Sequence, residues 1–291
     1  MELKLDNITK NYGTAATLSE VSFTLNPGVY GLLGANGAGK TTLFRIICGL
    51  MKPTQGAVKY NNRDISTQAE SFRTILGFLP QDFSYYPDFT ALKFMLYISS
   101  LKGLNHKTAK KRCLKLLKQV GLDDVKGKRI RKYSGGMKQR LGIAQAMIND
   151  PEILILDEPT AGLDPKERVK FRKLISSFAS KKIVILSTHI VADVEYIADE
   201  ILILKEGRLV DRGSVPALLK EIQHQVWECL ISEGEVTEME EKFLVSNRRH
   251  VENDILLRIV SDKKPKEDAR QVDPALEDLY LFYFQEGDNI E

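Results

Sequence analysis

One segment of the sequence, residues 34–41, constrains the fold more than any other, because it reads Gly-Ala-Asn-Gly-Ala-Gly-Lys-Thr. It matches the pattern G-x-x-x-x-G-K-[ST], in which small residues let backbone N–H groups surround a phosphate without clashes from side chains. The apolar run Val29–Leu33 before it predicts a short strand, and residues 40–50 after it predict a helix. A strand, a glycine-rich loop and a helix in this order predict a phosphate-binding site.

The phosphate contacts are expected on the loop and on the first turn of the following helix. A helix N-terminus carries a partial positive charge, which favours anions. Lys40 adds a full charge for the β- and γ-phosphates of a nucleotide, and we expect the Thr41 hydroxyl to be a ligand for Mg²⁺. A chance glycine-rich turn is the alternative, which the flanking strand and helix disfavour. The predicted nucleotide contacts here are Gly34, Asn36, Gly37, Gly39, Lys40, Thr41 and Thr42.

Two acidic residues follow the apolar run Ile153–Leu156. Continuous runs of β-branched residues and leucine are typical of parallel strands buried on both faces. Ligands of open α/β sheets bind beyond the carboxyl ends of such strands. We therefore expect Asp157 to hold Mg²⁺ through water, and Glu158 to polarise the attacking water as the general base. A solvated acidic pair is the alternative, which the phosphate loop upstream disfavours.

Between these two sites the chain reads Tyr133-Ser-Gly-Gly-Met137, followed by apolar residues at helical spacing. The segment resembles the L-S-G-G-Q signature of ABC ATPases, from which its first and last residues depart, and residues 1–215 as a whole resemble that family. Ser134 is suited to cap a helix N-terminus, which again favours an anion. The resemblance implies that this helix start faces the ATP held by a partner domain. The implied contacts are Ser134, Gly135 and Gly136.

The same resemblance assigns roles to four further positions. Tyr12 matches the aromatic residue that stacks on adenine, an interaction worth ~1–3 kcal/mol per base. Gln81 matches the glutamine that contacts Mg²⁺ and the attacking water. His189 matches the switch histidine at the γ-phosphate, and residues 161–164 match the loop that touches the opposite site. The implied catalytic residues are Glu158, His189 and Gln81, and the implied metal ligands are Thr41, Gln81 and Asp157.

The predicted fold class is α/β, with a P-loop NTPase core, an antiparallel β subdomain, a helical subdomain and a small C-terminal α/β extension. Alternation of apolar and polar residues over 1–33 predicts antiparallel strands with one exposed face. Helical patterning predicts the helical subdomain over about 82–148. The character of the sequence changes after Gly213. We therefore predict an ATPase domain over 1–215 and, over 216–291, either an accessory domain that braces or regulates a dimer or a packing extension.

The C-terminal region contains predicted strands, a charged segment and a final helix. Strands are expected at Val226–Ile231, Phe243–Val245 and Ile255–Val260. Residues 262–273 are highly charged, and we expect them to be mobile. Residues 273–284 end in an aromatic helix and resemble the tail of ATPases from bacterial drug, antibiotic and bacteriocin exporters.

Composition and charge restrict the function classes. The chain has 42 Lys and Arg against 39 Asp and Glu, and this net charge of +3 is too balanced to favour nucleic acid as a partner. No run approaches the ~20 apolar residues that a membrane-spanning helix needs, and the charged N-terminus is not a signal peptide. We expect a cytoplasmic protein that lies peripherally on the inner face of the cell membrane without inserting into it. Scattered Cys48, Cys113 and Cys229 predict free thiols.

The function that the resemblance implies is the ATP-hydrolysing motor subunit of a bacterial ABC transporter, and the tail favours an exporter. The expected partners are a transmembrane permease subunit and a second ABC ATPase, in a homodimer or heterodimer around two ATP. Alternatives are an importer subunit, a soluble ABC ATPase of DNA repair or translation, and a GTPase or kinase with the same loop. The interval from Lys40 to Ser134 shows no coiled-coil heptads, and no Asn-Lys-x-Asp segment for guanine occurs.

The segment after Gln81 is rich in aromatic residues, namely Phe83, Tyr85, Tyr86 and Phe89. These side chains are suited to line a groove for a cytoplasmic helix of the permease. Packing of this loop onto the helical subdomain is an equally supported alternative. The resemblance implies that the contacts with the cargo lie on the permease.

Overall fold

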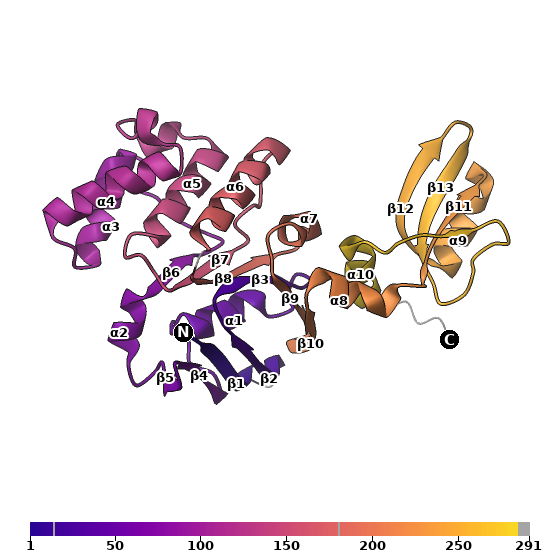
Figure 1. The fold of residues 1–291 in the computed structure, drawn as a ribbon, viewed down its shortest axis with the longest axis horizontal. Helices are drawn as coiled ribbons and strands as arrows, with labels where there is room; N and C mark the ends of the chain where they lie inside the picture. Colours follow the sequence, from indigo (N-terminus) through magenta and orange to yellow (C-terminus); the bar gives the residue numbers. More distant parts are fainter. Residues whose placement is uncertain (14, 180, 285–291) are drawn as a thin grey trace. The chain divides into compact units, whose positions relative to one another are not determined.

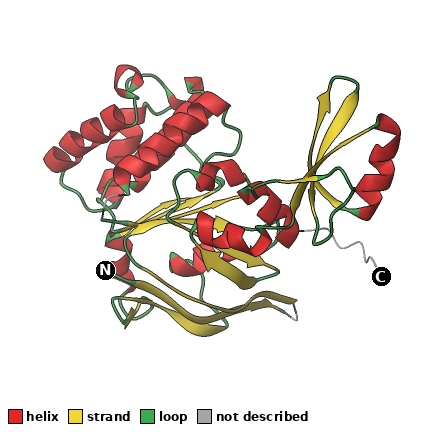
Figure 2. Cartoon of the chain, turned by 45° about the vertical axis from the view of Figure 1, so that its right-hand side comes forward, coloured by secondary structure: helices red, strands yellow, loops and turns green. Residues whose placement is uncertain are grey.

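The computed structural model describes residues 1–13, 15–179 and 181–284. The chain divides into two compact units, Met1–Val210 and Asp211–Glu291. Figures 1 and 2 show their helices and strands. Each unit has its own apolar core, so each can be understood by itself.

The first unit is built around a six-stranded sheet that carries the apolar runs of the sequence at its centre. Strands β7 (Ile153–Asp157) and β8 (Ile183–Thr188) are buried at every residue, as parallel strands covered on both faces require. They pair in parallel with each other, and β3 pairs in parallel with β8 on the other side. In sheet order the strands are β10 (Arg208–Gly213), β9 (Glu200–Lys205), β3 (Gly28–Leu33), β8 (Ile183–Thr188), β7 (Ile153–Asp157) and β6 (Leu76–Leu79).

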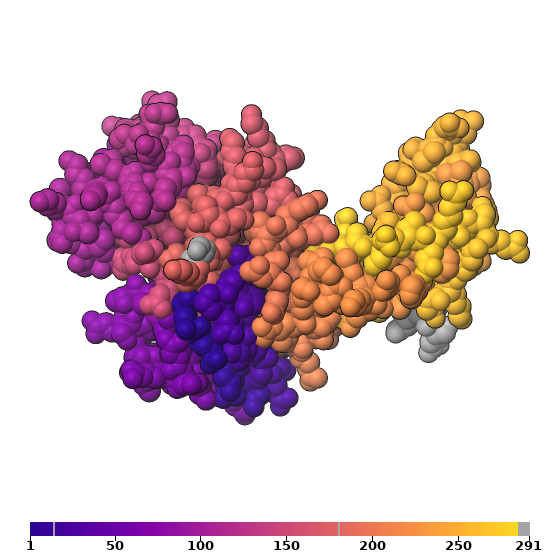
Figure 3. All heavy atoms as spheres, viewed as in Figure 1, coloured from indigo at the N-terminus to yellow at the C-terminus, as the bar shows by residue number. Residues whose placement is uncertain are grey.

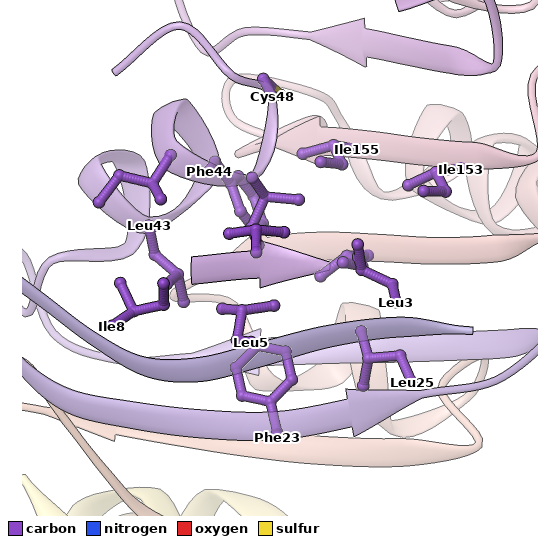
Figure 4. Packing of buried hydrophobic residues seen from close by; sticks show 14 of the residues in the cluster. Leu3, Leu5, Ile8, Phe23, Leu25, Leu43, Phe44, Cys48, Ile153 and Ile155 are labelled. Atoms are coloured by element: carbon purple, nitrogen blue, oxygen red, sulfur yellow. The ribbon is translucent and has the colours of Figure 1, made fainter. Parts of the chain in front are cut away.

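A second, antiparallel sheet of the first unit has one apolar face. Its strands, in order, are β2 (Ala15–Leu25), β1 (Leu3–Tyr12), β4 (Gln55–Tyr60) and β5 (Arg63–Asp64). The apolar face packs on helix α1 (Lys40–Ile47), and the shared core includes Leu5, Phe44 and Ile155 (Figure 4). The predicted antiparallel subdomain is therefore confirmed, except that residues 28–33 of the predicted range form β3 and pair in parallel with β8 and β9. The core lies between the two sheets.

On the side of the parallel sheet away from the antiparallel sheet, the first unit consists mainly of helices (Figure 1). Three of them, α3, α4 and α5, pack on one another within the range predicted for the helical subdomain. Among the described residues, no helix combines the length and the apolar character that crossing a bilayer requires. The helices of this unit after α1 are α2 (Ala69–Thr74), α3 (Ala91–Leu101), α4 (His106–Gln119), α5 (Gly135–Ala146), α6 (Pro165–Phe178) and α7 (Val191–Glu195).

The second unit contains a four-stranded antiparallel sheet in the order β12-β13-β11-β14. One face of this sheet forms an apolar core with α9, in which Cys229, Leu257 and Val236 are buried. The predicted strands and the final helix are present, and the strand expected at Phe243–Val245 begins at Leu244 and is longer. The elements are α8 (Val215–Leu218), β11 (Val226–Ile231), α9 (Val236–Lys242), β12 (Leu244–Val251), β13 (Asp254–Val260), β14 (Arg270–Gln271) and α10 (Leu276–Tyr283).

Residues 262–273, which we expect to be mobile from their charge, contact the sheet and its core in the structure. Ala269 is buried in the core, and Arg270 pairs with Glu228 of β11. Lys266 Nζ lies 2.9 Å from Glu235 Oε1. The contacts come from the backbone, from the small apolar side chain of Ala269 and from the ion pair of Lys266, which the charged composition alone does not indicate.

The final helix α10 is held by a buried carboxylate. Asp278, which is 1% exposed, accepts hydrogen bonds from Arg258 Nε (3.0 Å) and Nη2 (2.8 Å) on β13. It also accepts from Ser246 Oγ (2.6 Å) and from the backbone N–H of Ala275 (2.8 Å). This hydrogen bonding to Asp278 raises the pKa of Arg258. An ion pair between the buried Asp278 and the part-buried Arg258, with several hydrogen bonds, joins the helix to the sheet.

The three cysteines, Cys48, Cys113 and Cys229, are buried free thiols, as predicted. Burial raises the pKa of the Cys48 thiol, with the Asp157 charge as a smaller cause. A thiol of raised pKa that is shielded from solvent is chemically inert, so we assign these side chains to packing.

Candidate nucleotide-binding site

The glycine-rich loop joins β3 to α1, and close contacts require its glycines. Gly39 has a φ of 102°, and a Cβ atom there would lie 2.8 Å from the carbonyl oxygen of Thr17. A Cβ atom on Gly34 would lie 2.6 Å from the carbonyl oxygen of Leu204. Larger residues would therefore displace the loop from β2 and β9. The loop can reach the start of α1 by this path only because residues 34 and 39 are glycines without a Cβ atom.

Lys40 is the first residue of α1, and its ammonium group is enclosed. Its Nζ donates to the carbonyl oxygens of Gly34 (2.6 Å) and Ala35 (3.1 Å) and lies 3.8 Å from Glu158 Oε1. Burial lowers the pKa of Lys40, and the charges of Glu158 and Asp157 oppose this shift. A buried cation with limited compensation gains from a further negative charge. The site therefore favours an anion such as a phosphate beside Lys40.

A cavity of about 390 Å³ lies over the loop. Nine residues predicted from the sequence line it, together with Thr17 and Ala35, which the sequence reasoning missed. The predicted residues on its wall are Asn36, Gly37, Gly39, Lys40, Thr41, Thr42, Gln81, Glu158 and His189. These come from elements far apart in the chain, and the parallel sheet brings them together at the carboxyl ends of its strands.

Asp157 and Glu158 are held by a serine on the neighbouring strand. Asp157 ends β7 and is paired in register with Ser187 on β8. Ser187 Oγ donates to Asp157 Oδ1 (2.6 Å) and accepts from the Glu158 backbone N–H (3.0 Å). Glu158 has a φ of 46°, a left-handed conformation that is uncommon for residues other than glycine and is held by its surroundings. Ser187 thus positions both acidic residues.

His189 follows β8 and contacts the predicted general base. Its Nδ1 lies 2.9 Å from Glu158 Oε2, while its side chain remains 48% exposed and the Glu158 side chain is 6% exposed. This contact fixes the position of the Glu158 carboxylate relative to the imidazole ring. His189 therefore orients Glu158, and its side chain forms part of the cavity wall.

Ser187→Ala should weaken both stability and hydrolysis. The change leaves the buried Asp157 carboxylate and the Glu158 N–H each without a hydrogen-bond partner, which costs about 1–3 kcal/mol of unfolding free energy. Urea unfolding and phosphate release measure the two effects. Ser71→Ala, on the exposed surface of α2, is the control and should stay within about 0.5 kcal/mol of wild type. Equal behaviour of both variants would contradict the positioning role.

Tyr12 does not line the cavity. It lies at the end of β1 with 49% of its surface exposed. Its hydroxyl lies 3.1 Å from Met51 Sδ, and Lys10 Nζ lies 5.4 Å from its ring centroid. An exposed ring on the strand that pairs with β2 is free to stack on a planar ligand.

The signature segment also lies outside the cavity. The Ser134 side chain caps α5 by accepting from the Met137 N–H (3.3 Å). Ser134 and Gly135 are exposed, whereas Gly136 is buried, where a Cβ atom would lie 2.9 Å from Glu167 Oε2. The structure therefore gives this helix start no contact with the cavity of its own chain.

The oxygen donors near the cavity fit Mg²⁺. Thr41 and Gln81 line the cavity, and the Asp157 carboxylate lies beside Glu158 at the end of β7. The described residues contain no group of three or more His, Cys, Asp or Glu side chains that could hold a metal. Few protein ligands suit Mg²⁺, which keeps several waters and binds substrate phosphates.

Comparison with known proteins places these features in a family. A family model described as "ABC transporter" matches residues 18–161. The Nod factor export ATP-binding protein I of Burkholderia orbicola (strain AU 1054) is 35% identical over 216 residues, 74% of this chain and 71% of that protein. The lantibiotic transport ATP-binding protein SrtF of Streptococcus pyogenes is 38% identical over 210 residues, 72% of this chain and 89% of that protein.

A solved structure is similar as well. The ATP-binding cassette MJ0796, a dimer in a post-hydrolysis state bound to ADP and Pi, superposes with a TM-score of 0.65 at 29% identity, over 73% of this chain and 98% of that one. The fold and the loop over α1 define a nucleotide-binding protein of the P-loop class. Since the relatives are covered over most of their length, the chain belongs to the ABC transporter family, as one of its ATP-binding and ATP-hydrolysing proteins. The predicted fold class and ATPase activity are thereby confirmed.

Proposed function

We propose that this chain is the motor subunit of a bacterial exporter, in which two ATPase domains close around two ATP. The observation that carries this proposal is the position of the signature segment. Ser134 and Gly135 form an exposed, capped helix start that is separate from the cavity beside Lys40. A helix start attracts anions, and here the phosphates of the same chain lie elsewhere, so the γ-phosphate of a second chain is its proposed ligand.

Within one proposed site, each residue has a role that follows from its position. Lys40 and the loop N–H groups bind the phosphates, and Thr41, Gln81 and Asp157 would hold Mg²⁺, which neutralises phosphate charge when bound. Glu158 accepts a proton from the attacking water. His189 keeps the Glu158 carboxylate in place and contacts the γ-phosphate, and Tyr12 stacks on adenine. Cleavage removes the phosphate that links two chains, and the dimer opens.

The permease contact is proposed on part of the aromatic segment. Phe83 and Tyr85 pack inward, with ring centroids 4.7 Å apart, and Tyr85 donates to the Lys138 carbonyl oxygen (2.5 Å). Tyr86 instead stacks on Phe89 (5.0 Å), and both contact Tyr97 of α3. Tyr86 is 48% and Tyr97 39% exposed. We therefore assign the first pair to internal packing and this exposed aromatic cluster to docking of a permease helix.

The names of two relatives support a proposal for the direction of transport. One relative is named for Nod factor export and another for lantibiotic transport. We propose export and a peripheral position on the inner face of the cell membrane. We further propose residues 1–215 as the ATPase domain and residues 216–291 as an accessory domain.

Complementation between two inactive variants tests the two-chain site. Lys40→Ala removes the phosphate cation. Gly135→Asp adds a carboxylate at the signature helix start, where a Cβ atom meets nothing within 4 Å and an acidic residue in the first helical turn stabilises the helix. Each variant alone should be inactive, whereas a mixture should regain hydrolysis, because one of the two sites in a mixed dimer is intact. A mixture as inactive as its parts would contradict a site shared between two copies.

A further inference from the structure

Positive charge is concentrated in one stretch of the first unit. Residues 102–132 contain twelve Lys and Arg residues and two acidic residues, although the net charge of the whole chain is only +3. The rest of the chain is therefore net negative. In Figure 3 the middle of the chain, which contains this stretch, forms the outer edge of the first unit, at the upper left. Such asymmetry creates a local attraction for anions that the net charge hides.

Helix α4 carries the centre of this charge. Its core side is apolar, with Ala109, Cys113, Leu116 and Leu117 buried, and it contains no acidic residue. Steps of four, four and three residues place four of its lysines on one side of the helix. We define the lysine face as the five exposed lysines Lys107, Lys110, Lys111, Lys115 and Lys118.

The lysine face has no counter-charges of its own in the described part of the chain. Neighbouring cations are paired, since Arg112 lies 3.4 Å from Asp150 and Lys126 lies 2.8 Å from Asp123. No ion pair involves the five ammonium groups of the lysine face among the described residues. Five neighbouring like charges repel one another. An external polyanion would relieve this repulsion.

Apolar and further basic groups border the lysine face. Leu101, at the end of α3 and next to the turn that leads into α4, is 68% exposed. On the other flank, Lys115 lines a cavity of about 380 Å³ together with Arg112, Lys181 and Lys182, where Asp150 is the only acidic residue on the wall that the structure describes. Lysines beside exposed apolar side chains are typical of surfaces that lie on anionic membranes.

We propose that the lysine face binds the anionic headgroups of a phospholipid bilayer. A bilayer fits better than nucleic acid, because the remaining chain is net negative and would repel a long polyanion, whereas a bilayer meets one face only. The inference rests on the proposed function for bringing the chain to a membrane, but the attraction itself does not require a permease. Each lysine near an anionic surface contributes up to about fivefold in binding.

Vesicle co-sedimentation of the purified full chain tests the proposal. The chain should bind vesicles of phosphatidylglycerol and phosphatidylcholine, should not bind vesicles of phosphatidylcholine alone, and should be released by high salt. Replacing Lys107, Lys111, Lys115 and Lys118 by Gln should reduce binding by roughly 50-fold or more. The matched control replaces four exposed lysines outside the helical subdomain, Lys173, Lys220, Lys263 and Lys264, and should bind as wild type.

The proposal would be overturned by equal loss of binding in both quadruple variants or by equal binding to both kinds of vesicle. Binding to duplex DNA or polyglutamate with no binding to anionic vesicles would also overturn it. ATP hydrolysis by both variants should match wild type, since none of these lysines lines the nucleotide cavity. Failure of vesicle binding with intact, ATP-dependent dimerisation would reject this inference and leave the proposed function standing.

Discussion

Glu158→Gln is expected to reduce ATP hydrolysis by about 10²–10⁴-fold, the usual contribution of a general base, while ATP binding persists. The amide has nearly the shape of the carboxylate but cannot take the proton of the attacking water. It also removes a negative charge 3.8 Å from Lys40, so Lys40 is left to compensate phosphate charge alone. ATP-bound dimers should therefore accumulate. Phosphate release at saturating ATP and sedimentation velocity measure the two effects.

The control for this variant is Glu70→Gln, an exposed carboxylate on α2 that does not line the cavity. It should hydrolyse ATP at the wild-type rate and should not accumulate dimers. If Glu158→Gln also retained near-normal hydrolysis, another group would have to be the base. Loss of hydrolysis without dimers would instead leave the base assignment intact and count against the two-chain site.

Lys40→Ala is expected to weaken ATP binding by about 100-fold or more, because two charge-assisted hydrogen bonds of ~1.5 kcal/mol each correspond to roughly that factor. The variant also leaves Glu158 without its nearest cation, so an added phosphate meets uncompensated negative charge. Equilibrium dialysis with ATP measures the affinity directly. Hydrolysis should fall with occupancy.

Lys173→Ala, on the exposed surface of α6, serves as the matched control and should bind ATP as wild type does. Thermal unfolding without nucleotide shows whether each variant is folded. A folded Lys40→Ala chain with unchanged ATP affinity would remove the argument that the loop is a phosphate site.

The nucleotide loop could be predicted from the sequence because its determinants are local. Small residues over 34–39, the lysine at the helix start and the strand before them lie next to one another in the chain. The acidic pair after Ile153–Leu156 was accessible for the same reason, since a buried run followed by Asp157 and Glu158 defines a strand end.

Ser187 and Thr17 could not be assigned a place in the site, because their positions depend on strand order. Ser187 faces Asp157 only because β8 lies next to β7, and Thr17 borders the cavity only because β2 passes the loop. A single sequence gives the strands but not their neighbours. A polar residue at the end of a predicted buried strand, such as Ser187, was the one available signal.

The aromatic segment after Gln81 shows a different limit. Composition marked it as a surface of interest, but could not divide four similar side chains between inside and outside. The division depends on where Phe94 and Tyr97 of α3 lie, since one receives Phe83 and Tyr85 and the other receives Tyr86 and Phe89. Tertiary contacts settle such a division, and local pattern does not.

The carboxylate of Asp278 makes the last helix a structural part of the small sheet rather than a removable tail. A protein shortened before Leu276 would keep the Arg258 guanidinium on β13 but lose Asp278, its closest counter-ion, and would leave only Glu228 at 3.5 Å to compensate the charge. Deletion of the tail would then report on a damaged second unit, not on the contribution of the deleted residues. Substitutions on the exposed side of α10, such as at Phe282, keep the ion pair between Asp278 and Arg258. They therefore test the function of the helix surface without destabilising the second unit.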